Sequence, residues 1–109
     1  MNTFDDSTVI VLIEFDVMPH AIEAFAEAMR LGAAQRAHYP GCLKIDAYQS
    51  ADDETLFTLI EVFETQAAID AYYATALHAA WMASIQPLVK DIRGADQRSV
   101  YAGRSSGVS

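Results

Sequence analysis

Hydrophobic residues in this chain switch between two periods, and the order of the switches limits the folds that the chain can adopt. In residues 9–17 they occupy every second position of a run that also holds Glu14 and Asp16. Such alternation is typical of a β-strand with one buried face. After Pro19 they recur every three or four residues, which predicts a helix that ends at Pro40-Gly41. The apolar stripe of this helix consists of Ile22, Phe25, Ala26, Met29 and Ala33.

Two further alternating segments, residues 43–48 and 56–63, lie on either side of the polar turn 50–54, so we expect them to pair as a hairpin. Thr65 is a suitable N-cap for a second helix. A related helical segment is predicted over residues 78–90, where apolar and aromatic side chains again follow a spacing of three and four.

The rest of the chain completes a recognisable order of elements. Gly94 is expected to end the last helix, and residues 98–102 to add a short strand. The resulting order, β-α-β-β-α-β, is that of a ferredoxin-like split βαβ fold in the α+β class, an antiparallel sheet with helices on one face. We expect a single domain over residues 8–103, an N-terminal arm over 1–7 and a flexible tail over 104–109.

The second face of the predicted sheet carries too many apolar residues to stay in water. Ile10 and Leu12 lie there, together with one face of residues 56–63. A second copy of the sheet is the simplest cover, so the sequence predicts a homodimer.

Charge and composition limit the classes of molecule that the chain is expected to bind. The chain of 109 residues has a formal net charge of −8, from 15 acidic and 7 basic residues, which disfavours binding to nucleic acid or to an anionic membrane surface. No segment approaches the roughly 20 apolar residues of a membrane-spanning helix. Cys42 is the single cysteine, so no internal disulfide is expected, and we expect a cytoplasmic protein.

Three stretches resemble a known family, the antibiotic-biosynthesis and quinol monooxygenases of the dimeric α+β-barrel superfamily. They are the Pro-Gly-Cys turn within residues 39–45, the strand end Glu61-Val62-Phe63, and Ala67-Ala68-Ile69 followed by Tyr72, Tyr73 and His78. Two positions differ from the family pattern. Phe63 stands where the family has Trp, and Tyr72 or Tyr73 stands where it has its first His.

Two relatives of this family give further comparisons. The haem-degrading branch uses an Asn–Trp–His set, whose places fall here on Leu12, Tyr72 and Met82, so haem degradation is not expected. The run 92–103 is similar to isomerases of phosphorylated autoinducers, which share the fold.

His78 and Glu61 are the candidate catalytic residues. Histidine is the side chain most easily tuned to accept a proton near neutral pH, and His78 matches the family position. Glu61 shares a strand face with Phe57, Leu59 and Phe63, and would lie among apolar groups if that face meets the helices. Alternatively, His78 is a structural histidine and Glu61 a carboxylate paired with an arginine.

The aromatic residues suggest a wall for a flat ligand. The candidate substrate-binding residues are Phe63, Tyr72, Tyr73, Trp81 and Met82, although such a stripe also suits plain core packing. No phosphate-binding loop, flavin signature or strong metal-ligand spacing is present, so we expect neither a cofactor nor a bound metal.

The resemblance implies an oxidoreductase, a cofactor-independent monooxygenase that oxidises an electron-rich phenol, quinol or polyketide-like aromatic with O2. One alternative is an isomerase of small hydroxyketones, which needs a similar acid–base pair but no O2. Another is a non-catalytic, small-molecule-binding dimer module. Turnover without oxygen would separate the first two, and a pocket closed by side chains would favour the third.

Overall fold

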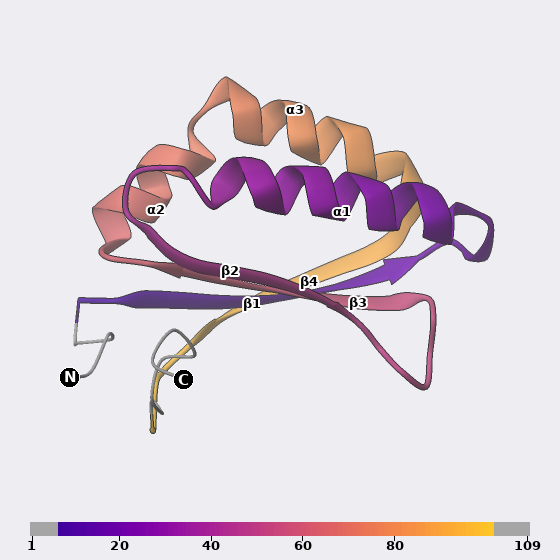
Figure 1. The fold of residues 1–109 in the computed structure, drawn as a ribbon, viewed down its shortest axis with the longest axis horizontal. Coiled ribbons are helices and arrows are strands. Elements are labelled where there is room, and N and C mark those ends of the chain that lie inside the picture. Colours follow the sequence, from indigo (N-terminus) through magenta and orange to yellow (C-terminus); the bar gives the residue numbers. More distant parts are fainter. Residues whose placement is uncertain (1–6, 102–109) are drawn as a thin grey trace.

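A computed structural model describes residues 7–101 and shows one four-stranded antiparallel sheet with all three α-helices on one face (Figure 1). The strands lie in the order β2-β3-β1-β4. The elements in chain order are β1 (Val9–Val17), α1 (Ile22–Arg36), β2 (Cys42–Gln49), β3 (Leu56–Phe63), α2 (Gln66–Tyr73), α3 (Ala76–Ile85) and β4 (Val89–Gln97). Short 3-10 turns, η1 (Pro19–Ala21) and η2 (Gln86–Leu88), precede α1 and β4. The predicted α+β, ferredoxin-like class is confirmed.

The C-terminal part of the fold differs from the sequence prediction. The helix predicted to continue to Lys90 ends at Ile85, and the last strand is β4 rather than residues 98–102. Gly94 lies inside this strand opposite Ile13 and does not end a helix. Residue 102 and the predicted tail, 104–109, are outside the described residues, as are positions 1–6 of the predicted arm.

Two clusters of buried side chains fill the space between the sheet and the helices. The larger includes Phe15, Phe25 and Phe57, whose rings pack with centroids 5.2 Å apart for the first pair and 4.9 Å apart for the last. The smaller consists of Val11, Phe63, Ile69 and Tyr72 and lies against α2. Strands β1 and β3 therefore turn the alternating residues of one face toward the helices, as predicted for β1.

Helices α1 and α3 approach each other closely at Gly32. A Cβ atom at this position would lie 2.1 Å from Nε1 of Trp81, so only glycine leaves room for the indole. The indole N–H donates a hydrogen bond of 3.2 Å to the Ala28 carbonyl, which fixes the ring against α1.

Within residues 7–101, no helix is long and apolar enough to cross a membrane.

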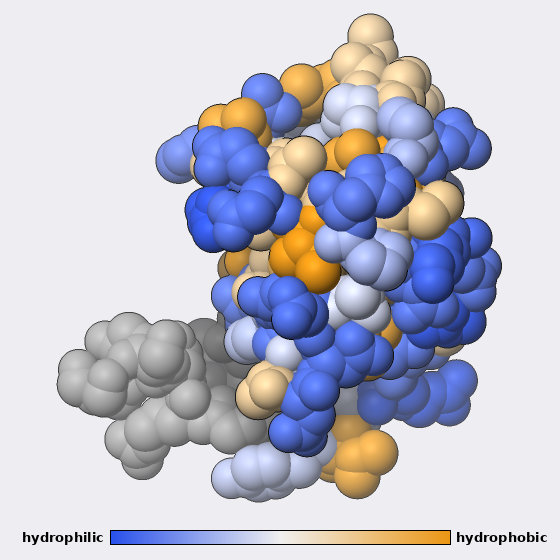
Figure 2. Space-filling model, turned by 90° about the vertical axis from the view of Figure 1, so that its right-hand side faces the viewer, coloured by the Kyte–Doolittle hydropathy of each residue, from blue (hydrophilic) through white to orange (hydrophobic). Residues whose placement is uncertain are grey.

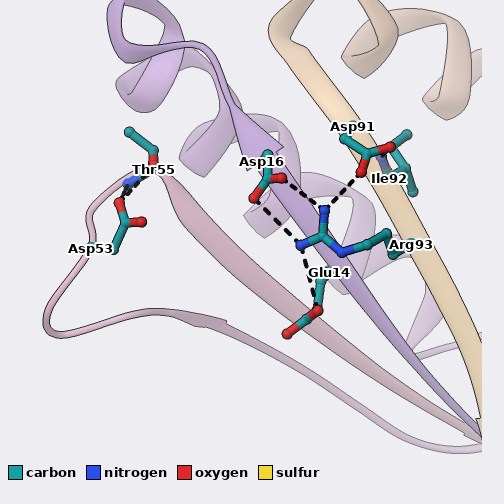
Figure 3. Close-up of polar contacts among 7 residues, drawn as sticks. All are labelled: Glu14, Asp16, Asp53, Thr55, Asp91, Ile92 and Arg93. Carbon is teal, nitrogen blue, oxygen red and sulfur yellow. Dashed lines mark hydrogen bonds and ion pairs between the residues drawn. The ribbon is translucent and has the colours of Figure 1, made fainter.

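The sheet face away from the helices has an apolar half and a charged half. Register pairs Ile10 with Val62 and Leu12 with Ile60 in the apolar half. In the charged half, the Arg93 guanidinium bridges Asp16 and Asp91 at 2.7 and 2.8 Å (Figure 3). The end of the molecule at which α1 begins and α3 ends is mostly hydrophilic, with hydrophobic residues in separate patches (Figure 2).

Candidate functional site

A cavity of about 210 Å³ lies between the sheet and α3, where the two core clusters meet. Its walls are mainly apolar. The lining residues are Val11, Ile13, Phe15, Glu61, Tyr73, His78, Trp81, Met82, Ile92 and Gly94. Five residues singled out from the sequence, Glu61, Tyr73, His78, Trp81 and Met82, are therefore brought together here.

The other two predicted binding residues lie deeper. Phe63 and Tyr72 are almost completely buried and do not line the cavity. Their rings stack on each other, with centroids 5.9 Å apart. Of the two adjacent tyrosines, Tyr73 is therefore the one that faces the cavity, because it lies at the end of α2 while Tyr72 points into the core.

His78 is held in place by the break between α2 and α3. The side chain of Thr75 caps α3 and accepts a hydrogen bond of 3.1 Å from the His78 backbone N–H. The imidazole packs against the rings of Tyr73 and Tyr72, with centroids 4.9 and 5.2 Å away. Burial, followed by the positive charge of Arg36, lowers the pKa of His78 below its ordinary value of 6.5. The imidazole is therefore neutral near neutral pH and able to accept a proton.

Glu61 is the centre of a buried polar chain. Its Oε2 accepts a hydrogen bond from Nη1 of Arg36 at 2.5 Å, and its Oε1 accepts one from the Tyr73 hydroxyl at 2.7 Å. Glu61 and Arg36 are each only 1% exposed. Burial, together with the Glu61 charge, raises the pKa of Tyr73, so the phenol stays protonated and keeps donating. Because both carboxylate oxygens already accept hydrogen bonds, Glu61 suits the role of holding Tyr73 better than that of a free base.

Arg36 is the site residue that the sequence analysis missed. It sits on the buried face of α1 with Phe25, Met29 and Gly32, at the spacing of three and four that marks a core stripe. A lone arginine in such a stripe signals a buried partner, because unpaired buried charges are costly. Its guanidinium carbon lies 4.1 Å from the centre of the Trp81 ring, a cation–π contact. Its Nε and Nη2 have no hydrogen-bond partner among the described residues.

No group of three or more His, Cys, Asp or Glu side chains within residues 7–101 is arranged to hold a metal ion. What the geometry offers is a neutral imidazole and a hydrogen-bonded phenol at the wall of an apolar cavity. Such a site can remove a proton from a small, mainly apolar molecule at His78, while the Tyr73 oxygen, whose proton is donated to Glu61, can accept a hydrogen bond from that molecule.

Comparisons with known structures support the fold. A Nitrosomonas europaea protein named as a proposed antibiotic biosynthesis monooxygenase is 28% identical, with a TM-score of 0.82 over 90% of this chain and 95% of that one. Rv0793 from Mycobacterium tuberculosis is 20% identical, with a TM-score of 0.81 over 90% of this chain and 100% of its own. PA3566 from Pseudomonas aeruginosa is 20% identical, with a TM-score of 0.81 over 88% of this chain and 97% of its own.

A comparison with curated proteins gave no match. A match to a family as a whole also covers most of the chain. Residues 8–84, from the start of β1 almost to the end of α3, fit the family described as antibiotic biosynthesis monooxygenase. This segment contains the catalytic candidates and all the aromatic candidates. The chain is therefore a member of the antibiotic biosynthesis monooxygenase family.

Proposed function

We propose that this protein is a cofactor-independent monooxygenase that uses O2 to oxidise a single-ring, electron-rich phenol or quinol. The observation that carries the proposal is the neutral His78 imidazole at the wall of an apolar cavity, beside the Tyr73 hydroxyl. Membership of the family supports the reaction class. The geometry supports His78 as the base, and Tyr73 as a group whose oxygen accepts a hydrogen bond from the substrate hydroxyl and so positions it.

The proposed reaction begins with proton transfer. His78 takes the proton of a bound phenol, and the resulting anion gives one electron to O2, which forms a phenoxyl radical and superoxide. The two radicals combine at a ring carbon that bears hydrogen, and the protonated His78 returns its proton to the peroxide. Loss of water then leaves a quinone, so one phenol and one O2 give one quinone and one water. The apolar walls favour radical recombination by keeping bulk water away.

Cavity size limits the substrate of this reaction. An apolar protein cavity of about 150 Å³ can hold benzene. The cavity beside His78, at about 210 Å³, therefore has room for one substituted ring. A fused polyketide-like system would need space beyond it.

Oxygen uptake by the purified, metal-free apoprotein tests the proposal. We expect uptake with at least one compound of a panel of single-ring phenols and quinols, at a rate above autoxidation. His78→Gln should reduce this rate by roughly 10²- to 10⁴-fold, the usual contribution of a general base. His20→Gln, a change at an exposed position in η1, is the matched control and should keep the rate. Wild-type uptake no faster than autoxidation across the panel would contradict the proposal, and turnover without oxygen would favour an isomerase.

A further inference from the structure

A second cavity, of about 300 Å³, adjoins the one beside His78 and lies between α2 and the neighbouring strands β1 and β4. We refer to the cavity beside His78 as the inner cavity and to this one as the outer cavity. The outer cavity is lined by Val9, Val11, Gln66, Ile69, Tyr73, Gly94, Ala95 and Asp96. Val11, Tyr73 and Gly94 line both cavities, so the two spaces meet at these residues.

Gly94 forms the floor of this junction. It lies opposite Ile13 on the helix-facing side of the sheet, in β4. A Cβ atom at Gly94 would meet only Cγ1 of Ile13, at 3.7 Å, so the space above the glycine is open. The glycine has no backbone conformation that requires it, and its missing side chain leaves a passage between the cavities.

The two cavities differ in polarity. The inner cavity is mainly apolar apart from Glu61, Tyr73 and His78, whereas Asp96 and Gln66 add polar groups to the outer one. Asp96 pairs in register with Val11, which lines both cavities, so its carboxylate lies on the helix-facing side near the junction. The Gln66 amide nitrogen donates to Asp70 at 2.8 Å, which leaves its carbonyl oxygen as an acceptor. No Lys or Arg side chain is among the described residues that line either cavity.

We propose that the two cavities form one bipartite ligand site, in which a ring occupies the inner cavity and a cationic arm passes over Gly94 to Asp96. This inference rests on the proposed function for the position of the ring. A carboxylate and an amide oxygen at the far end recognise a positively charged or proton-donating group. An anionic arm would meet Asp96 without a counter-charge, in a chain whose net charge is already −8.

Three phenols with two-carbon arms test this proposal: tyramine has a cationic arm, 4-ethylphenol a neutral one and 4-hydroxyphenylacetate an anionic one. Their dissociation constants are measured anaerobically by calorimetry and NMR titration on the full chain. We expect tyramine to bind roughly two- to fivefold more tightly than 4-ethylphenol, the range of a solvent-accessible ion pair. 4-Hydroxyphenylacetate should bind most weakly, and added salt should reduce the differences.

Variants separate charge from space. Asp96→Asn should bring tyramine to the affinity of 4-ethylphenol, whereas Asp91→Asn, on the opposite sheet face in the Arg93 cluster, should preserve the difference. Gly94→Val should block the passage and weaken both compounds while phenol itself still binds. Gly94→Ala should weaken binding less than Gly94→Val, since its Cβ would lie at an ordinary contact distance from Ile13.

Equal affinities for the three compounds, or an unchanged preference in Asp96→Asn, would overturn the bipartite site, as would the absence of binding by all three. Oxygen uptake is measured separately on the same compounds. The expected binding order without any uptake would reject the proposed oxidation and retain the bipartite site. Uptake without the binding order would do the reverse.

Discussion

At the scale of single residues, His78 and Glu61 occupy the same cavity wall with different hydrogen-bonding demands. Both oxygens of Glu61 accept hydrogen bonds, one from the buried Arg36 and one from Tyr73. His78 packs against two tyrosine rings, and burial favours its neutral form. We therefore propose that His78 carries the mobile proton and that Glu61 acts by positioning Tyr73.

The first prediction concerns the titration of His78. Its pKa should lie below 6.5, because burial and the Arg36 charge both disfavour the imidazolium. The unfolded chain then binds the proton more tightly than the folded one. The contribution of His78 to stability is therefore complete above about pH 6.5 and declines as the pH falls through the folded pKa.

NMR titration of the imidazole signals gives the pKa of His78 directly. Urea unfolding at several pH values gives the pH dependence of the free energy of unfolding. His78→Gln should remove this part of the pH dependence. The rate of phenol oxidation should likewise fall as the pH drops through the same pKa. A titration at or above 6.5 would mean that the imidazole is not in a dry cavity.

At the scale of elements, the contact between α1 and α3 gives the second prediction. In a solvent-exposed helix, Gly→Ala stabilises by up to about 1 kcal/mol. At Gly32 the added methyl would collide with the Trp81 indole, so Gly32→Ala should instead destabilise by roughly 1–3 kcal/mol. Urea unfolding followed by circular dichroism measures the free energy, and a stabilised variant would show that the helices can separate at little cost.

The third prediction concerns the ion pair that joins α1 to β3. Glu61→Gln leaves the buried Arg36 guanidinium without a counter-charge and should lower the free energy of unfolding by about 3–5 kcal/mol. The double variant Arg36→Met/Glu61→Leu should recover most of that loss, because it removes both charges.

The exposed pair Arg30–Glu27, within α1, is the matched control. Glu27→Gln should cost less than about 1 kcal/mol, since water screens this pair. Similar losses for Glu27→Gln and Glu61→Gln would mean that water reaches the pair between α1 and β3.

Most elements could be predicted from the sequence because their apolar residues are periodic. Strand β4 could not, since Ile92 is the single large apolar residue between Lys90 and Gln97. An edge strand that pairs only with β1 through its backbone needs no apolar stripe. Because the last strand was predicted at residues 98–102, Ile92 and Gly94 were not predicted as site residues. The helical stripe through His78 and Trp81 could be predicted, since its residues recur every three or four positions. Arg36 and Glu61 are 25 residues apart in the sequence, and their pairing depends on the tertiary fold. Their pairing could therefore not be predicted from the sequence.

At the scale of the whole molecule, one sheet face has helices over it and the other has none (Figure 1). Ile10, Leu12 and Ile60 are only partly buried on the second face. We propose that a second copy of the chain covers this apolar half, with the same surface on both subunits.

The fourth prediction is therefore a homodimer. Light scattering at micromolar concentration should give about twice 11.9 kDa. Leu12→Lys should produce monomers by placing a charge in the covered half. Leu31→Lys, at an exposed position of α1, is the control and should leave the mass unchanged. A wild-type monomer at every concentration would contradict this arrangement.

Trp81 gives the molecule an optical property that follows from its place in the fold. It is the single tryptophan of the chain, it lines the inner cavity, and the Arg36 guanidinium lies against its ring. Fluorescence excited at the indole band therefore originates entirely at the cavity wall. A ligand ring that enters the inner cavity changes the polarity around the indole and so shifts the wavelength of its emission. A quinone, as an electron acceptor, quenches this emission. The unlabelled protein thus reports filling of the cavity as a shift in the emission wavelength of Trp81, and formation of a quinone as a loss of its fluorescence intensity.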